Sequence, residues 1–329
     1  MTAMEFFYPS PLSTTLCLLA AAIGVGPMNC DAQSNFPSKP LHFIAMGAGF
    51  PENTARIIGN EIAQITKQVV VVESKPGANG IMAAEFVAKA PADGYTLLVG
   101  TNSTHAANPS LYKKLPYDYV KDFSPVSGIS QGMMLLLVHP RVPVKTLKDL
   151  TALALKHPDE LTFGSGSSVA LIGVEYYKLI MGLKIRNVPY KTAPQSITDL
   201  VSGRIDIVMS NLGSAMPQVE ANKLRALAVS GSQRWISIPQ IPTMKESGVK
   251  DYEWSFWIAT WLPAGAPSAV VSKLNELIHS ALIKSKTKDY LLNAGSTAFA
   301  NTAEELMAYQ IKEHDKWRKV ILAAKVSEE

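Results

Sequence analysis

The chain has 329 residues, of which 47% are hydrophobic and 18% are charged, and this composition predicts a folded protein with a large core and two lobes. Its formal charge of +4 is small, and no run of basic residues resembles those that follow a nucleic acid backbone, so we expect no nucleic acid partner. Glycine and proline, 21 of each, are spread along the sequence, which excludes a low-complexity chain.

The first 32 residues have the pattern of a cleaved secretory signal peptide. Residues 16–25, LCLLAAAIGV, form an apolar segment too short to span a bilayer, and small residues precede a possible cleavage point after Ala32. The segment departs from the usual pattern because residues 1–15 contain Glu5 and no Lys or Arg. Both cysteines precede the cleavage point, so the mature chain would have neither a disulfide nor thiol chemistry. We expect an exported protein.

Strand-like and helix-like segments alternate along the first part of the mature chain. A short apolar strand is predicted at residues 41–45, followed by the loop MGAGF and a helix that opens at Pro51. Four consecutive valines at residues 69–72 predict a strand that is buried on both faces. The turn KPGANG precedes a helix at residues 81–90, and PADGY precedes a strand at residues 96–99.

The same alternation continues to the end of the chain. Residues 133–138 predict a buried strand, and Thr146 with Asp149 has the spacing of a capping box at a helix start. A second capping box, Thr302 with Glu305, opens a long C-terminal helix. Alternating strands and helices indicate an α/β protein with mostly parallel sheets. The other predicted elements are strands at 161–164, 187–190, 205–209 and 224–229 and helices after residue 168, around residues 197–200 and at 270–282.

A dinucleotide-dependent enzyme of the Rossmann type is one alternative interpretation. Gly47 and Gly49 lie between the first strand and its helix, and the next strand ends in an acidic residue, Glu73. However, Glu52 stands where the third glycine of the fingerprint belongs. A carboxylate at the start of the helix would repel the pyrophosphate that the fingerprint binds, so the sequence favours this alternative less.

Motifs for hydrolysis or for metal binding are missing from the sequence. Residues 164–168, GSGSS, only imitate the GxSxG turn that carries a nucleophilic serine. The six histidines are scattered without the spacing of a zinc site. We therefore expect that the protein is not an enzyme and has no metal site and no cofactor.

The most specific feature is the stretch at residues 100–126, GTNSTHAANPSLYKKLPYDYVKDFSPV. It closely resembles a signature of the Bug-type periplasmic substrate-binding receptors of tripartite tricarboxylate transport systems. The resemblance runs from about residue 36 to the C-terminus and includes VVVVESKPGANG, APADGYTLLVGT, NVPYKTAPQSITDLVSGRIDIVMSN, IPTMKESG and WLPAGAP. It implies a periplasmic receptor that captures a small organic carboxylate for uptake, works with membrane transporter subunits and is a monomer.

The resemblance also implies an α/β, two-lobed periplasmic binding protein fold (type II-like) with a ligand cleft between the lobes. We place lobe 1 at residues 33–130 and 231–329 and lobe 2 at residues 131–230. Two strand crossings would form the hinge on which the lobes close.

Such a receptor is expected to hold carboxylates with backbone N–H groups at helix starts and with small hydroxyls. Three loops fit this expectation, each at the carboxyl end of a strand, where open α/β sheets place ligands. Asn211 ends the strand of IDIVMSN, where relatives present Asn or Asp to the ligand, and Trp257 would be an aromatic wall or a core residue. The alternative for each Ser or Asn is that it only caps a helix. The candidate ligand-binding residues are Met46, Gly49, Phe50, Thr101, Asn102, Ser103, His105, Ser165, Ser167, Ser168, Asn211 and Trp257.

The sequence departs from the family pattern at the candidate pocket. Relatives usually carry a PPGG turn and then Asp where this chain has MGAGF and Glu52. Leu171 replaces a frequent His, and Thr192 replaces a common Gly after residues 189–191. These departures leave the identity of the carboxylate open. They also admit a receptor-like protein that signals or scavenges without transport.

Overall fold

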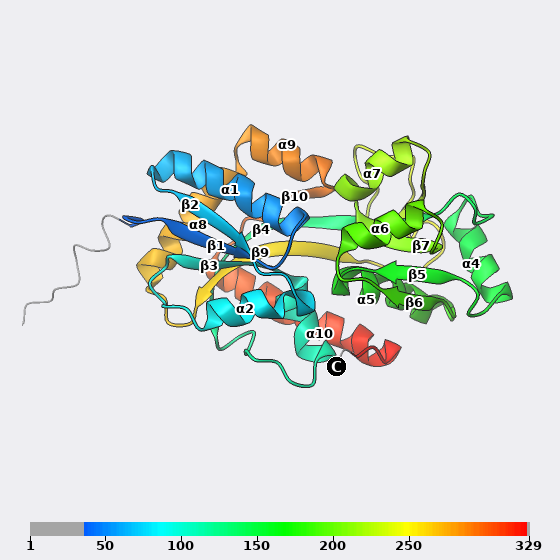
Figure 1. The fold of residues 1–329 in the computed structure, drawn as a ribbon, viewed down its shortest axis with the longest axis horizontal. Coiled ribbons are helices and arrows are strands. Elements are labelled where there is room, and N and C mark those ends of the chain that lie inside the picture. Colours follow the sequence, from blue (N-terminus) through cyan, green and yellow to red (C-terminus); the bar gives the residue numbers. More distant parts are fainter. Residues whose placement is uncertain (1–35, 328–329) are drawn as a thin grey trace, which may run out of the picture. The chain divides into compact units, whose positions relative to one another are not determined.

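Helices and strands alternate along residues 36–327, the part of the chain that the computed structural model describes (Figure 1). The signal peptide predicted at residues 1–32 lies outside the described residues. Within residues 36–327, no helix is both long and apolar enough to cross a bilayer.

The strands of this part of the chain join in the order β2-β1-β3-β9-β4-β7-β5-β6, and β8 and β10 also pair with β4. The strands are β1 (Leu41–Ala45), β2 (Val70–Ser74), β3 (Thr96–Thr101), β4 (Phe123–Val138), β5 (Thr162–Ser165), β6 (Arg186–Pro189), β7 (Ile207–Asn211), β8 (Arg225–Val229), β9 (Ser255–Pro263) and β10 (Ser296–Ala298). The helices are α1 (Phe50–Thr66), η1 (Ala78–Gly80), α2 (Ile81–Ala88), η2 (Ser103–Ala107), α3 (Asn108–Leu111), α4 (Leu147–Lys156), α5 (Ser168–Met181), α6 (Ala193–Val201), α7 (Leu212–Glu220), α8 (Ser268–Leu282), α9 (Ser285–Asn293) and α10 (Ala303–Ala324).

Strand β4 belongs to two sheets. Its first part, up to Met133, pairs with β9, which in turn pairs with β3. From Met134 onward, β4 pairs with β7 on one side and, from Leu135, with β8 on the other. Figure 1 shows β4 and β9 as long neighbouring ribbons that connect the two sheets. The sheet of β1–β3 and the sheet of β5–β8 are therefore joined through one continuous strand.

The expectation of mostly parallel sheets is wrong. The pairs β1/β2, β1/β3, β5/β6 and β5/β7 are parallel, but β4 and β9 are antiparallel to every strand that they pair with. The sequence predicted only residues 133–138 of β4 and did not predict β9. The first half of β4 contains Ser, Gly and Pro in place of a continuous apolar run, so its strand character has no clear local signal.

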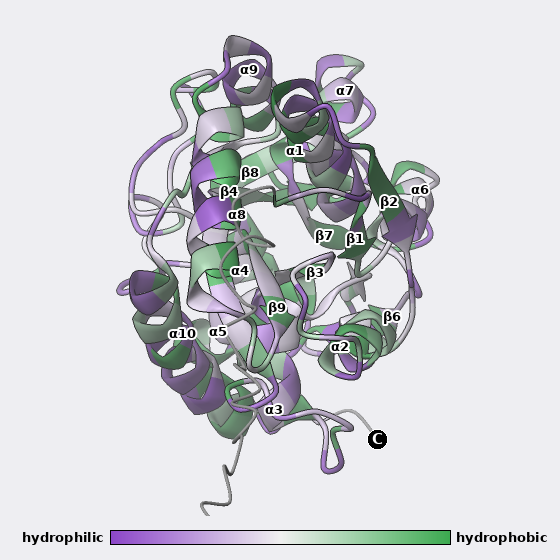
Figure 2. Ribbon diagram, turned by 90° about the vertical axis from the view of Figure 1, so that its left-hand side faces the viewer, coloured by the Kyte–Doolittle hydropathy of each residue, from purple (hydrophilic) through white to green (hydrophobic). Residues whose placement is uncertain are grey.

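The strand of consecutive valines is an edge strand, which corrects the prediction that it is buried on both faces. Among the strands that the structure describes, β2 pairs only with β1, and Val69 and Val71 are 61% and 40% exposed. Val70 and Val72 point the other way, toward α1, where a Cβ added to Gly59 would lie 2.8 Å from Val70 Cγ1. Figure 2 colours β2 as hydrophobic along most of its length. A run of valines alone does not reveal whether a second strand covers the outer edge.

The predicted helix starts are confirmed where capping residues define them. Thr146 accepts a hydrogen bond from the N–H of Asp149, whose carboxylate accepts from the N–H of Thr146, so α4 begins with a capping box. Thr302 and Glu305 make the same reciprocal pair at the start of α10. These local contacts satisfy N–H groups that would lack a partner inside the helix.

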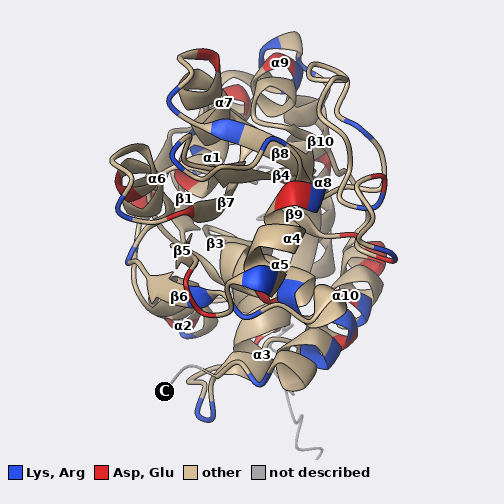
Figure 3. Cartoon of the chain, turned by 90° about the vertical axis from the view of Figure 1, so that its right-hand side faces the viewer, with Lys and Arg blue, Asp and Glu red and all other residues tan. Residues whose placement is uncertain are grey.

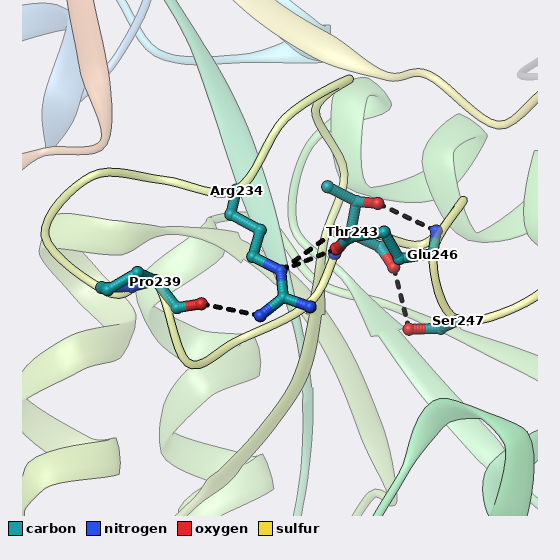
Figure 4. A network of polar contacts seen from close by, with 5 residues as sticks. All are labelled: Arg234, Pro239, Thr243, Glu246 and Ser247. Atoms are coloured by element: carbon teal, nitrogen blue, oxygen red, sulfur yellow. Dashed lines mark hydrogen bonds and ion pairs between the residues drawn. The ribbon is translucent and has the colours of Figure 1, made fainter.

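A network of polar contacts fixes the long connection between β8 and β9 (Figure 4). Arg234 Nε donates to the carboxylate of Glu246 at 2.8 Å, and Arg234 also donates to the carbonyl of Pro239 at 2.9 Å. The N–H of Thr243 donates to the same carboxylate at 2.8 Å, and this bond is the main reason why the pKa of Glu246 is lowered. Ser247 donates to the carbonyl of Thr243. The connection is thus held before the chain enters β9.

Candidate functional site

The carboxyl ends of β3 and β7 meet where β4 passes from one sheet into the other. Asn211, the last residue of β7, pairs with Met134, while the neighbouring Met133 pairs with Ser255 at the start of β9. Asn102, which directly follows β3, donates from Nδ2 to the carbonyl of Ser255 at 3.3 Å. The sheet registers therefore bring two predicted loops to one crossing, although the loops are far apart in the sequence.

The loop after β3 is folded back on itself and contacts the loop after β1. The hydroxyl of Thr101 accepts from the N–H of Ser103 at 3.1 Å and donates to the sulfur of Met46 at 3.0 Å. Ser103 then opens the π-helical turn η2. Three of the predicted site residues thus lie in direct hydrogen-bonded succession.

A hydrogen bond joins Ser103 to the third predicted loop. The hydroxyl of Ser168, the first residue of α5, donates to the hydroxyl of Ser103 at 2.6 Å, and both side chains are almost fully buried. Because Ser168 provides the proton of this bond, the proton of the Ser103 hydroxyl is left for another acceptor. A carboxylate oxygen is an acceptor of that kind. The contact links a loop of the β1–β3 sheet directly to a loop of the β5–β8 sheet.

The other two serines of the third loop have different partners. Ser165 donates its hydroxyl to Asn187 Oδ1 at 2.7 Å, so this side chain is turned toward β6. Ser167 is the N-cap of α5 and accepts from the N–H of Ala170 at 3.3 Å. Asn211 likewise caps α7, accepting from the N–H of Ser214 at 3.0 Å. Ser167 and Asn211 therefore both cap helices.

Removing the N-cap of α5 is expected to cause a measurable loss of stability. Ser167→Ala is expected to lower the free energy of unfolding by about 0.5–2 kcal/mol, because the N–H of Ala170 loses its acceptor. Ser268→Ala is a matched control, since Ser268 is an exposed serine in the first turn of α8, where no side chain caps the helix. Urea denaturation of both variants measures the difference. Equal stability of Ser167→Ala and the parent chain would contradict the capping role.

The loop after β1 contains a glycine with free space around it and a phenylalanine whose ring is packed against other rings. Gly49 has a φ of +96°, and a Cβ placed there would meet no atom within 4 Å. The ring of Phe50 lies edge-on to Phe256 at 5.4 Å and stacks on Tyr290 at 5.8 Å. Phe256 follows Ser255 in β9, so Phe50 reaches the strand that starts at the crossing.

His105 is fully buried among aromatic side chains. Its ring is fully buried, stacks on Trp261 at 3.7 Å and meets Phe123 edge-on at 4.9 Å. Nδ1 is 2.9 Å from the hydroxyl of Thr104. Burial lowers the pKa of His105 to about 3, so the ring is neutral at physiological pH. Burial and these contacts are typical of a core histidine.

Trp257 also packs inside the protein. Its ring centroid lies 5.9 Å from that of Trp261 and 5.6 Å from that of Tyr309, and the side chain is fully buried. Its Nε1 has no hydrogen-bond partner within the described residues. The core alternative stated for this residue fits these contacts.

The crossing is built from uncharged strands. Strands β3, β4, β5, β7 and β9 contain no Asp, Glu, Lys or Arg. In Figure 3 the charged residues instead gather on helices such as α10 and on loops. Lys191, the cation in the motif NVPYKTAPQ, is exposed. Within the described residues, the loop side chains that make up the candidate site form no hydrogen bond with Lys or Arg. The donors at the crossing are therefore hydroxyls, amides and backbone N–H groups.

Comparison with known proteins identifies the family to which the chain belongs. Residues 54–326 match the tripartite tricarboxylate transporter family receptor. The chain belongs to this receptor family. It is 28% identical to the protein BugT of Bordetella pertussis over 316 residues, which cover 94% of this chain and 96% of BugT. The resemblance to the Bug-type receptors is confirmed.

Solved structures agree with this fold over most of the chain. R. palustris Rpa4515 with adipate is 30% identical with a TM-score of 0.85, and the match covers 89% of this chain and 99% of that one. MatC from Rhodopseudomonas palustris with bound malate is 28% identical with a TM-score of 0.80, covering 87% and 100%. The two-lobed periplasmic binding protein fold is therefore confirmed, and the family is a family of receptors, not of enzymes.

The dinucleotide alternative is not supported. Glu52, at the start of α1, is engaged by Arg56 and by the hydroxyl of Ser74 at 2.8 Å, and these hydrogen bonds lower its pKa. A carboxylate held ionised in the first turn of the helix opposes the binding of a pyrophosphate there. The family match agrees with this conclusion.

Proposed function

We propose that this protein is a periplasmic receptor that binds a small organic dicarboxylate at the crossing of its two sheets and delivers it for uptake. The observation that carries the proposal is the buried hydrogen bond between Ser103 and Ser168, which joins loops from both sheets. The relatives Rpa4515 and MatC, whose structures contain adipate and malate, support a dicarboxylate as the ligand class.

One carboxylate group would be held by uncharged donors. The hydroxyl of Ser103 has a proton to donate. The N–H groups of Ser168 and Val169 lie in the first turn of α5, where the helix itself offers them no carbonyl acceptor. Partial positive charge at the start of this helix favours an anion without a Lys or Arg side chain. The loops at Gly49 and Asn211 would complete the pocket.

The binding site would lie between lobe 1, residues 33–130 and 231–329, and lobe 2, residues 131–230. The register of β4 supports this division, because the strand exchanges β9 for β7 between Met133 and Met134. On the return path, Ser230 accepts from the N–H of Met134 and donates to the carbonyl of Trp254. The two chain segments that cross between the sheets are thus tied together.

We also propose export with cleavage after Ala32, a monomeric receptor, and delivery to the membrane subunits of a tripartite tricarboxylate transporter. The family match supports a transport role. A receptor that signals or scavenges without transport is the alternative, and growth of a deletion strain on the bound carboxylate as sole carbon source separates the two.

A thermal-shift screen tests the ligand class. We expect adipate or malate to stabilise the mature protein, by about 2.7 kcal/mol when the ligand is present at 100 times its Kd. Hexane-1,6-diol is the matched control for adipate, since it has the same chain length without carboxylates, and NAD tests the dinucleotide alternative. Stabilisation by NAD or by the diol, with none by any dicarboxylate, would reject the proposal.

A further inference from the structure

The motif YKKLPYD at residues 112–118 lies outside the ligand-binding loops, yet one of its tyrosines reaches them. The hydroxyl of Tyr117 donates to the carbonyl of Thr104 at 2.9 Å and accepts from Asn108 Nδ2 at 3.3 Å. Thr104 directly follows Ser103. The motif is thus hydrogen-bonded to the turn that carries the central serine of the candidate site.

A second segment, the turn KPGANG, joins the same network. Asn108 Nδ2 also donates to the carbonyl of Asn79 at 3.2 Å, and Asn79 Nδ2 donates to the hydroxyl of Tyr112 at 3.0 Å. The network therefore connects η1, the segment η2–α3 and the YKKLPYD motif through side-chain donors that bond to side-chain and backbone oxygens. The turn at η1 lies more than 20 residues before the other two segments, which follow each other directly in the sequence.

The turn KPGANG also packs against two of the candidate loops. A Cβ added to Gly80 would lie 2.9 Å from Met46 Cβ and 2.9 Å from Thr104 Cγ2, and Gly80 has a φ of +86°. Only glycine accepts both the backbone conformation and this close approach. The loops after β1 and β3 thus both pack against the turn KPGANG at Gly80.

The hydroxyl of Tyr117 and its ring have separable roles. The side chain is 5% exposed, and its ring meets Phe123 edge-on at 5.7 Å. Burial raises the pKa of this hydroxyl far above its usual range, so it keeps the proton that it donates to Thr104. Removal of the oxygen alone would leave the packing of the ring intact.

We propose that Tyr117 is a positioning residue for ligand binding, and that its hydroxyl holds the turn at residues 103–107 in the orientation in which Ser103 meets Ser168. This inference rests on the proposed function. Without the bond to Thr104, the turn would adopt other orientations for part of the time. The apparent affinity of the receptor would then fall in proportion to the fraction of molecules that remain competent to bind.

The test compares Tyr117→Phe with Tyr177→Phe. Tyr177 is a matched control, because it is also a buried tyrosine and its hydroxyl lies 2.7 Å from Thr151 Oγ1, between α5 and α4. With adipate as the probe, we expect Tyr117→Phe to bind about three- to tenfold more weakly, the scale of one lost hydrogen bond. Tyr177→Phe should bind as the parent protein does.

The kinetics distinguish positioning from direct contact. If Tyr117 only orients the turn, the association rate falls and the dissociation rate stays nearly constant, because the bound state keeps all its ligand contacts. Loss of a direct contact would act mainly on the dissociation rate. A faster dissociation of adipate from Tyr117→Phe, or an equal loss of affinity in both variants, would overturn the inference.

Amide hydrogen exchange provides a readout that needs no ligand. We expect faster exchange at residues 103–107 in Tyr117→Phe than in Tyr177→Phe. Unchanged exchange there would overturn the inference even if the receptor binds adipate. If the parent protein binds neither adipate nor malate, the proposed ligand class fails, and the exchange experiment still decides whether Tyr117 holds the turn.

Discussion

Replacing Ser103 by alanine is expected to weaken the binding of adipate about ten- to a hundredfold. Ser103 has a hydroxyl proton free for an acceptor, since Ser168 donates the hydrogen bond that joins the two side chains. Loss of one hydrogen bond to a charged group costs about 1.5–3 kcal/mol, which corresponds to that range of affinity. Ser168→Ala should act in the same direction, because it removes the donor that orients the hydroxyl of Ser103.

Two controls separate recognition from general damage. Ser127→Ala removes another fully buried hydroxyl, which donates to the carbonyl of Gly128 at 2.8 Å in the part of β4 that pairs with β9. Lys191→Ala removes the exposed cation of the motif NVPYKTAPQ. Both should bind adipate nearly as the parent protein does in calorimetry. If Lys191→Ala abolishes binding while Ser103→Ala binds normally, a salt bridge holds the ligand and hydroxyl recognition is wrong.

Acid is expected to destabilise the protein through His105. Its folded pKa is lowered to about 3 from 6.5 by burial, so between these values the unfolded chain binds a proton that the folded chain does not. Stability therefore falls as the pH decreases below about 6.5, at about 1.4 kcal/mol per pH unit. Between pH 7 and pH 5 the loss from this residue amounts to about 2 kcal/mol.

His105→Phe isolates this contribution. Phenylalanine keeps an aromatic ring against Trp261 and Phe123 but does not titrate. Denaturation at pH 7 and pH 5 gives the loss of stability for each protein, and the loss should be smaller in the variant. An identical loss in both proteins would show that His105 is not buried in a neutral form.

The sequence correctly predicted the helix starts and the strands that are defined by neighbouring residues. The capping boxes at Thr146 and Thr302 appear as predicted, because each is formed by residues within one helical turn. The strands of the parallel units begin and end within a few residues of their predicted bounds. Strand β9 was not predicted, because its side chains are buried on both faces and periodicity alone does not distinguish such a run from a buried helix segment.

The arrangement of the site depends on contacts that no local pattern contains. The sequence predicted Ser103 and Ser168 as separate loop residues, and the sheet registers bring them within 2.6 Å of each other. The pairing of Ser165 with Asn187 and the support from Tyr117 involve residues far apart in the chain. The stacking of His105 on Trp261 likewise needs β9, the strand that the sequence did not reveal.

A crystal structure of the receptor grown with adipate tests the central claim most directly. The account predicts one carboxylate of adipate within hydrogen-bond distance of the Ser103 hydroxyl and of the N–H groups at the start of α5, with no Lys or Arg side chain on that carboxylate. Adipate bound with its carboxylate paired to Lys191 or another cation, or bound away from the crossing of β4 and β9, would contradict it.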